Sequence, residues 1–144
     1  MLVRIGTNSA ELIEAAGGIK PGCEIKKVLS GGPMMGIAMS SVDVPVCKNN
    51  NALTVLAKDE VELAEEQATA CIRCGRCTRV CPIKLVPQLM ADAAERKDYE
   101  AYEKKYYGLD CIACGSCTYI CPAKRPLMQL FKETKGAIMA AKRK

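Results

Sequence analysis

The sequence predicts an α+β fold in two parts, a small strand-and-helix module followed by a helical domain rich in cysteine. Residues 1–70 carry 6 Lys+Arg and 9 Asp+Glu, a net charge of −3, whereas residues 71–144 carry 15 and 7, a net charge of +8. Eight of the ten cysteines also lie in the second part. Apolar residues follow strand spacing before the cysteine motifs and helical spacing after residue 82. We therefore place the domain boundary between residues 59 and 70.

Residues 1–58 combine patterns typical of short strands and one helix. Asn8 can cap a helix in which Glu11 reaches back to the cap, and two glycines can end it in the left-handed conformation. The expected elements are a strand at Leu2–Ile5, a helix from Asn8 to Gly17-Gly18, and strands within Glu24–Ser30 and Ala52–Ala57. This order within about 55 residues indicates an incomplete β-grasp-like module.

The segment Ser30-Gly31-Gly32-Pro33-Met34-Met35-Gly36 has two interpretations, a tight turn between strands or a backbone cradle for a phosphate or other anion. We favour the turn, because the spacing is not Gly-x-Gly-x-x-Gly and no Lys-Ser/Thr follows. The single cysteines Cys23 and Cys47 have no near partner, and we expect buried, inert thiols. Residues 59–70 are acidic and are expected to form a helical connector.

Two cysteine quartets carry the chemistry. Residues 71–82 and 111–122 both have the spacing Cys-x2-Cys-x2-Cys-x3-Cys-Pro, and they start 40 residues apart. This is the bacterial ferredoxin spacing, in which the fourth cysteine ligates the other cluster. The rule predicts two [4Fe–4S] clusters with crossed ligands. Cluster 1 takes Cys71, Cys74, Cys77 and Cys121, and cluster 2 takes Cys111, Cys114, Cys117 and Cys81.

The residue types fit this chemistry. Gly75 and Gly115 let the backbone approach inorganic sulfur, and the proline after each quartet turns the chain away. The chain has no histidine, which excludes His-based catalysis, Cys–His zinc sites, Rieske ligation and c-type haem attachment. Structural zinc held by cysteine alone remains the less favoured alternative, since zinc sites use paired Cys-x2-Cys motifs separated by a wide gap.

The segments after each quartet predict helices, and hence a ferredoxin domain of the α-helical type. Residues 85–94 form an apolar stripe, Asp98 can cap a second helix that carries Tyr99, Tyr102 and Tyr106, and Gly108 can stop it. Pro126 can open a last helix. Its apolar face would contain Leu127, Leu130, Phe131, Thr134 and Ile138.

Basic residues flank the quartets, namely Arg73, Arg76, Arg79, Lys84, Lys124 and Arg125. They can neutralise the anionic clusters, or raise the reduction potential and dock an acidic partner. No motif supports nucleic-acid binding. The longest uncharged stretch, Val28–Val42, has 15 residues, whereas a membrane-spanning helix needs about 20. Without a signal peptide after Met1, we expect a reducing cytoplasmic environment in which cysteines bind metal.

The order of these motifs resembles a known family. Residues 11–18, the segment 30–36, Asp43-Val44-Pro45-Val46 and the two quartets together resemble the C subunit of the Rnf/Rsx ion-translocating oxidoreductase. The resemblance covers essentially the whole chain but only the C-terminal portion of the family's polypeptide. It implies a β-grasp module of the soluble-ligand-binding type, residues 1–58, followed by the two-cluster domain, residues 71–144.

The resemblance also implies a function. The chain would be a peripheral electron-transfer subunit on the cytoplasmic face of a membrane translocase that links ferredoxin and NAD, with ferredoxin and other subunits as partners. Flavin and NAD would bind a missing or partner domain. Two alternatives are a fragment of a cobalamin-reductase-like soluble reductase and a structural zinc interaction module.

Overall fold

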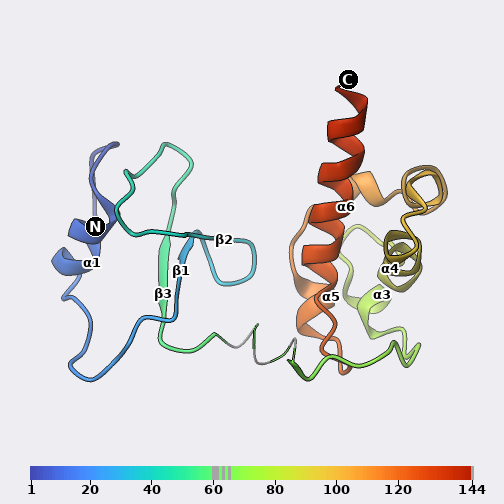
Figure 1. Ribbon diagram of the computed structural model, residues 1–144, viewed down its shortest axis with the longest axis horizontal. Coiled ribbons are helices and arrows are strands. Elements are labelled where there is room, and N and C mark those ends of the chain that lie inside the picture. Colours follow the sequence, from blue (N-terminus) through green and yellow to red (C-terminus); the bar gives the residue numbers. More distant parts are fainter. Residues whose placement is uncertain (60–61, 63, 65, 144) are drawn as a thin grey trace. The chain divides into compact units, whose positions relative to one another are not determined.

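The computed structural model describes residues 1–59, 62, 64 and 66–143. The chain divides into two compact units, Met1–Glu60 and Val61–Lys144 (Figure 1). The acidic connector includes residues 60, 61, 63 and 65, which lie outside the described residues, so its helix stays a prediction. No helix among the described residues has the length and apolar character needed to cross a bilayer.

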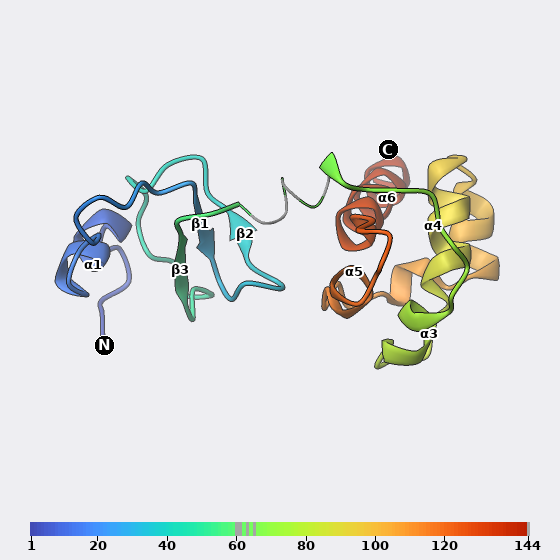
Figure 2. The same ribbon diagram turned by 90° about the horizontal axis from the view of Figure 1, so that it is seen from below.

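The first unit is built on a three-stranded antiparallel sheet in the order β2-β1-β3. Strand β1 (Lys27–Ser30) lies between β2 (Ile37–Ala38) and β3 (Leu53–Leu56), as Figure 2 shows. Val28 and Leu29 of β1 are buried, because the central strand has a neighbour on both sides. The strands expected within 24–30 and 52–57 are confirmed in shorter form, whereas the two-residue β2 was not foreseen.

Helix α1 (Ser9–Ala15) begins where the sequence predicts. The Asn8 side chain accepts a hydrogen bond from the Ala10 N–H at 2.8 Å, and the chain leaves the helix through Gly17 and Gly18, both at positive φ. The buried Ser9 hydroxyl donates to the Val44 carbonyl at 2.9 Å. These bonds attach the helix to the 43–46 segment, which is paired with the chain at Asn8.

The strand expected at Leu2–Ile5 is wrong. This segment has no strand conformation, and the Leu2 side chain is fully exposed. Apolar, β-branched residues favour a strand only where a neighbouring strand accepts the backbone hydrogen bonds and covers one face. Among the described residues, pairing with the 43–46 segment begins only after this point, with the Gly6 N–H donating to Val46 O at 2.9 Å.

The glycine-rich segment 31–36 is the turn between β1 and β2, which confirms the favoured interpretation. Gly31 has φ +112°, and the Gly36 N–H donates to the Gly32 carbonyl at 2.8 Å. A Cβ on Gly36 would lie 2.5 Å from that same oxygen. Close backbone approach therefore explains the glycines here.

The second unit is helical, which with the sheet of the first unit confirms the α+β class. Its described residues include the α-helices α3 (Arg76–Val80), α4 (Pro87–Glu95), α5 (Ser116–Tyr119) and α6 (Leu127–Lys142), with a π-helical turn at Ala101–Lys105 and a 3-10 turn at Gly108–Asp110. The long α6 packs along α4 (Figure 1). The α4–α6 core contains Met90, Ala91, Ala93, Ala94, Tyr102, Leu127, Phe131 and Ile138.

The stripe expected on the last helix is confirmed, since Leu127, Phe131, Thr134 and Ile138 are buried. The stripe at 85–94 is only partly right. Met90 and Ala94 are buried, but Leu89 is 41% exposed. The α-helix starts only at Pro87, because proline is favoured in the first turn and its ring disfavours helical backbone at the residue before it.

Asp98 caps the turn at 101–105 as predicted, accepting from the Ala101 N–H at 3.0 Å. The turn is π-helical, and it ends at Lys105 rather than at Gly108. Of the three tyrosines expected on one face, Tyr102 is fully buried, Tyr106 packs against the core and Tyr99 is 40% exposed. The Tyr102 and Phe131 ring centroids lie 6.2 Å apart.

Gly108 is a packing constraint on this core. A Cβ there would lie 2.2 Å from the Tyr102 ring, which is fully buried and cannot move aside. We predict that Gly108→Ala lowers the free energy of unfolding by about 3 kcal/mol through overpacking. Anaerobic urea denaturation followed by circular dichroism measures this.

Gly136→Ala is the matched control. Gly136 lies within α6 with nothing within 4 Å of a new Cβ, so the same substitution should stabilise the helix by about 0.5–1 kcal/mol. Equal midpoints for the two variants would show that the Tyr102 contact does not constrain the core.

Candidate metal centre

The two quartets fold into loops of the same conformation. In each loop the residue two positions after the first cysteine has positive φ, +55° at Arg73 and +52° at Ala113. The glycine after the second cysteine also has positive φ, +70° at Gly75 and +81° at Gly115, and a short helix follows it. The 40-residue sequence repeat is therefore a structural repeat.

The chain turns again after the fourth cysteine of each quartet. Lys84 and Lys124 have φ +60° and +53°, and their N–H groups donate to the carbonyls of Cys81 and Cys121 at 3.2 and 3.1 Å. Left-handed backbone costs about 1–2 kcal/mol at a residue other than glycine. Both repeats hold such residues at matching positions, which indicates that the loops are shaped by what they enclose.

The first loop surrounds a hollow. Its cysteine lining comprises Cys71, Cys74 and Cys77 of the first quartet and Cys121 of the second. The other lining residues are Ile72, Gly75, Gln88, Ala123, Arg125 and Leu127. Cys71 and Cys74 are exposed, whereas Cys77 and Cys121 are half-buried.

The second loop surrounds a separate hollow. Its cysteine lining comprises Cys111, Cys114 and Cys117 of the second quartet and Cys81 of the first. The surroundings are apolar, with Ile83, Leu85, Met90, Met128 and Phe131 among the lining residues. Cys81 is buried and its sulfur accepts a hydrogen bond from the Leu85 N–H at 3.3 Å.

The structure thus gathers the eight quartet cysteines into two groups, each with three members from one repeat and the fourth from the other. Helices α3 and α5, which follow the two loops, pack against each other and bring the repeats together. These are the two groups that the ferredoxin rule predicts. Sequence reasoning missed Gln88, which lines the first hollow from the helix after the first quartet.

Two thiols of the second hollow, those of Cys111 and Cys117, have raised pKa values. Burial, and then the neighbouring Cys111 sulfur, raise the pKa of Cys117 to about 11, and burial likewise raises the pKa of Cys111. The pKa of Cys114 is lowered, because the Ser116 hydroxyl, 3.5 Å from its sulfur, stabilises the thiolate. Buried thiols of this kind lose their protons when metal cations lie among them.

The donor set fits iron–sulfur clusters. Each hollow offers four sulfurs, and the buried Cys81 sulfur already accepts a backbone N–H, the kind of bond that stabilises an anionic cluster. Among the described residues, no three metal-binding side chains converge closely enough for a single ion. A [4Fe–4S] cluster does not require its ligands to converge on one point, because each thiolate bonds to its own iron atom.

The expectation for the two single cysteines is wrong. Cys23 and Cys47 are both exposed. Cys23 lies in a surface turn after Gly22, where its N–H donates to Lys20 O at 3.0 Å, and Cys47 follows the paired 43–46 segment. A turn leaves its side chains in solvent whatever their preference for the interior.

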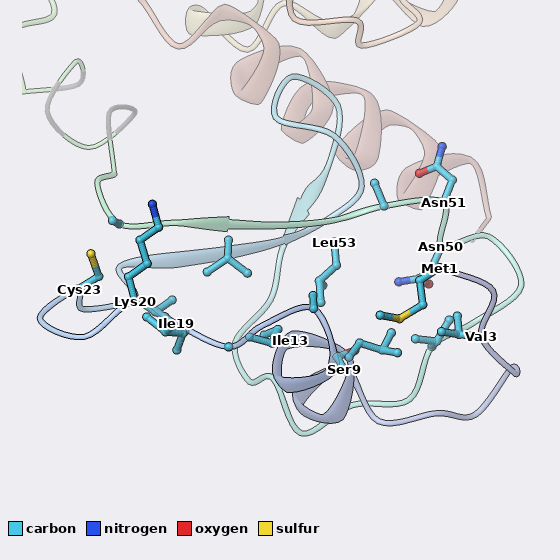
Figure 3. Close-up of a pocket in the computed structure, with 18 of the residues that line it drawn as sticks. Met1, Val3, Ser9, Ile13, Ile19, Lys20, Cys23, Asn50, Asn51 and Leu53 are labelled. Carbon is cyan, nitrogen blue, oxygen red and sulfur yellow. The ribbon is translucent and has the colours of Figure 1, made fainter.

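The first unit contains a different kind of hollow, with a volume of about 540 Å³ (Figure 3). It lies between α1 and β3, and Figure 3 shows Ile13, Ile19 and Leu53 on its walls. Cys23 also lines it, but the glycine-rich turn does not. Its lining is mainly aliphatic, so it differs in chemistry from the sulfur-lined hollows.

Comparisons with known proteins agree with this geometry. Residues 64–130 match the model of the 4Fe-4S dicluster domain. The chain is 44% identical over 141 residues to the C subunit of the proton-translocating ferredoxin:NAD(+) oxidoreductase complex of Clostridium ljungdahlii. It is 42% identical over 142 residues both to the C subunit of the ion-translocating oxidoreductase complex of Methanosarcina acetivorans and to that of the Na(+)-translocating ferredoxin:NAD(+) oxidoreductase complex of Acetobacterium woodii.

These matches cover 98–99% of this chain but only 30–31% of each relative. They confirm the resemblance that the motif order indicates. Residues 64–130 are therefore similar to the 4Fe-4S dicluster domain, and nearly the whole chain is similar to part of the C subunit of ion-translocating oxidoreductase complexes.

Proposed function

We propose that this chain relays single electrons through two [4Fe–4S] clusters within an ion-translocating ferredoxin:NAD oxidoreductase. The observation that carries the proposal is that eight cysteines line two hollows, four in each. Each hollow has three cysteines from one quartet and one from the other. Cysteine-ligated clusters of this type exchange one electron each when bound. The names of the homologues support the assignment to such a complex.

The residues of this chain act as ligands and as surroundings. In our proposal Cys71, Cys74, Cys77 and Cys121 hold cluster 1, and Cys111, Cys114, Cys117 and Cys81 hold cluster 2. Backbone N–H groups donate to sulfur, as Leu85 does to Cys81, and apolar side chains exclude water from the second hollow. None of these roles needs an acid, a base or a nucleophile.

The context of the relay belongs to the same proposal. Cluster binding lies in residues 71–144, residues 59–70 connect it to the module at 1–58, and flavin and NAD bind elsewhere in the subunit or its partners. The chain would lie at the cytoplasmic face of the membrane, with ferredoxin and the other subunits as partners. Arg73 and Arg79, both exposed and both within the first quartet, offer an acidic partner a docking surface.

Metal analysis tests the proposal. After anaerobic reconstitution we predict about eight iron and eight sulfide per chain, because two [4Fe–4S] clusters contain that number, and EPR signals of two interacting clusters after dithionite reduction. Zinc in place of iron, or a colourless protein after reconstitution, would contradict the electron relay.

Single substitutions test the crossed ligand sets. Cys71→Ser and Cys121→Ser should damage one cluster, and Cys111→Ser and Cys81→Ser the other, because the members of each pair line the same hollow. EPR spectra of the reduced variants distinguish the two classes. Cys23→Ser and Cys47→Ser are matched controls that should keep both signals. Grouping of Cys71→Ser with Cys81→Ser would refute the crossed assignment.

Cluster removal should unfold the second unit selectively. Each cluster would join the two repeats, and helices of five and four residues are too short to persist alone. After oxidation and chelation we predict loss of hydrogen-exchange protection in α3 to α6, while strand β1 stays protected. Retained protection in α4 and α6 would show that their core is sufficient without the clusters.

A further inference from the structure

The two hollows are equivalent by the 40-residue repeat, but two lining positions differ in chemistry. The first hollow is lined by Arg125 and the second by its repeat equivalent, Leu85. The first is also lined by Gln88 and the second by its equivalent, Met128. In both cases the polar side chain lies beside the Cys71–Cys121 group.

Arg125 is placed to act on a ligand sulfur. Its side chain is only 12% exposed, and it is paired with Glu95. Arg125 and Cys71 line the same hollow, and a guanidinium is always charged in proteins. Glu95 is half exposed and is absent from the lining of the hollow, so its opposing charge is further away and better screened.

Gln88 adds a second polar group at the same place. Its Oε1 atom is buried and has no hydrogen-bond partner among the described residues. A buried acceptor without a partner costs about 1–3 kcal/mol, so the Gln88 side chain gains from the alternative orientation of its amide. When the amide turns, its NH2 group can donate to sulfur in the hollow.

The second hollow has no arginine or lysine among the described residues that line it, and its polar side-chain contact to sulfur is the neutral Ser116 hydroxyl, 3.5 Å from the Cys114 sulfur. Lys135 approaches Cys111, and its Nζ donates to the Leu109 carbonyl at 2.6 Å and to the Cys111 carbonyl at 3.4 Å. Lys135 therefore binds backbone oxygens, and it is absent from the lining of the hollow. Cys81 is buried there, whereas Cys71 and Cys74 of the first group are exposed.

We propose that Arg125, with Gln88, raises the reduction potential of cluster 1 above that of cluster 2. Reduction adds a negative charge, so a cation and amide donors at the ligand sulfurs, together with greater solvent exposure, favour the reduced state. Cluster 1 is then reduced first, and reduced cluster 2 is the stronger reductant. This inference rests on the two-cluster proposal.

Redox titration of the anaerobically reconstituted chain, followed by EPR, tests it. Arg125→Leu gives this position the residue that its repeat equivalent already has. We expect the higher of the two potentials to fall by about 59 mV or more, a tenfold change in a one-electron equilibrium constant, and the lower potential to stay unchanged. Lys132→Leu is the charge-matched control, because Lys132 is exposed on α6 and lines neither hollow.

Glu95→Gln separates electrostatics from structure. It breaks the same ion pair as Arg125→Leu but keeps the guanidinium, so it should leave the higher potential unchanged or raise it. Equal downward shifts in both variants would show that the ion pair matters only for packing. No shift in Arg125→Leu, or a shift of the lower potential alone, would overturn the inference while iron and sulfide contents still supported the relay.

Discussion

The exchange of the fourth cysteine between the two repeats is the constraint on which the second unit depends. Cys121 joins the loop of the first quartet, and Cys81 joins the loop of the second. The helices next to these loops have only five and four residues, and non-glycine residues such as Arg73 and Lys84 adopt left-handed backbone. Local propensity opposes both features. In the proposed electron relay, metal–thiolate bonds between the repeats would supply what the local sequence does not, and the α4–α6 core packs beside the loops.

The same geometry makes two similar sites unequal. Because the fourth ligand crosses over, the residues after it cross over too, so each hollow is completed by side chains from the opposite repeat. Position 125 therefore serves the first hollow and position 85 the second. A duplicated sequence can in this way give each cluster its own surroundings through single substitutions, without change to the ligands or to the loops. For an electron relay, a difference in surroundings is a difference in potential.

The sequence predicted the structure best where the residue type and its spacing alone determine the local conformation. The cysteine spacing, the asparagine and aspartate caps at Asn8 and Asp98, and the apolar stripe of α6 were all readable in this way. The errors arose where neighbours decide the outcome. Leu2–Ile5 has strand-forming residues but no adjacent strand there, and Cys23 lies in a turn that keeps it in solvent. No sequence motif pointed to Gln88, since only the fold shows that it lines the four-sulfur hollow. It stands out only by comparison with Met128 in the second repeat.

The central claim is that each cluster binds three cysteines of one repeat and one of the other. The most direct test is a crystal structure of the anaerobically loaded chain, with anomalous diffraction at the iron edge to place the metal. The account predicts two separate iron groups, one bonded to Cys71, Cys74, Cys77 and Cys121, and the other to Cys111, Cys114, Cys117 and Cys81. An iron group bonded to all four cysteines of a single quartet would contradict it.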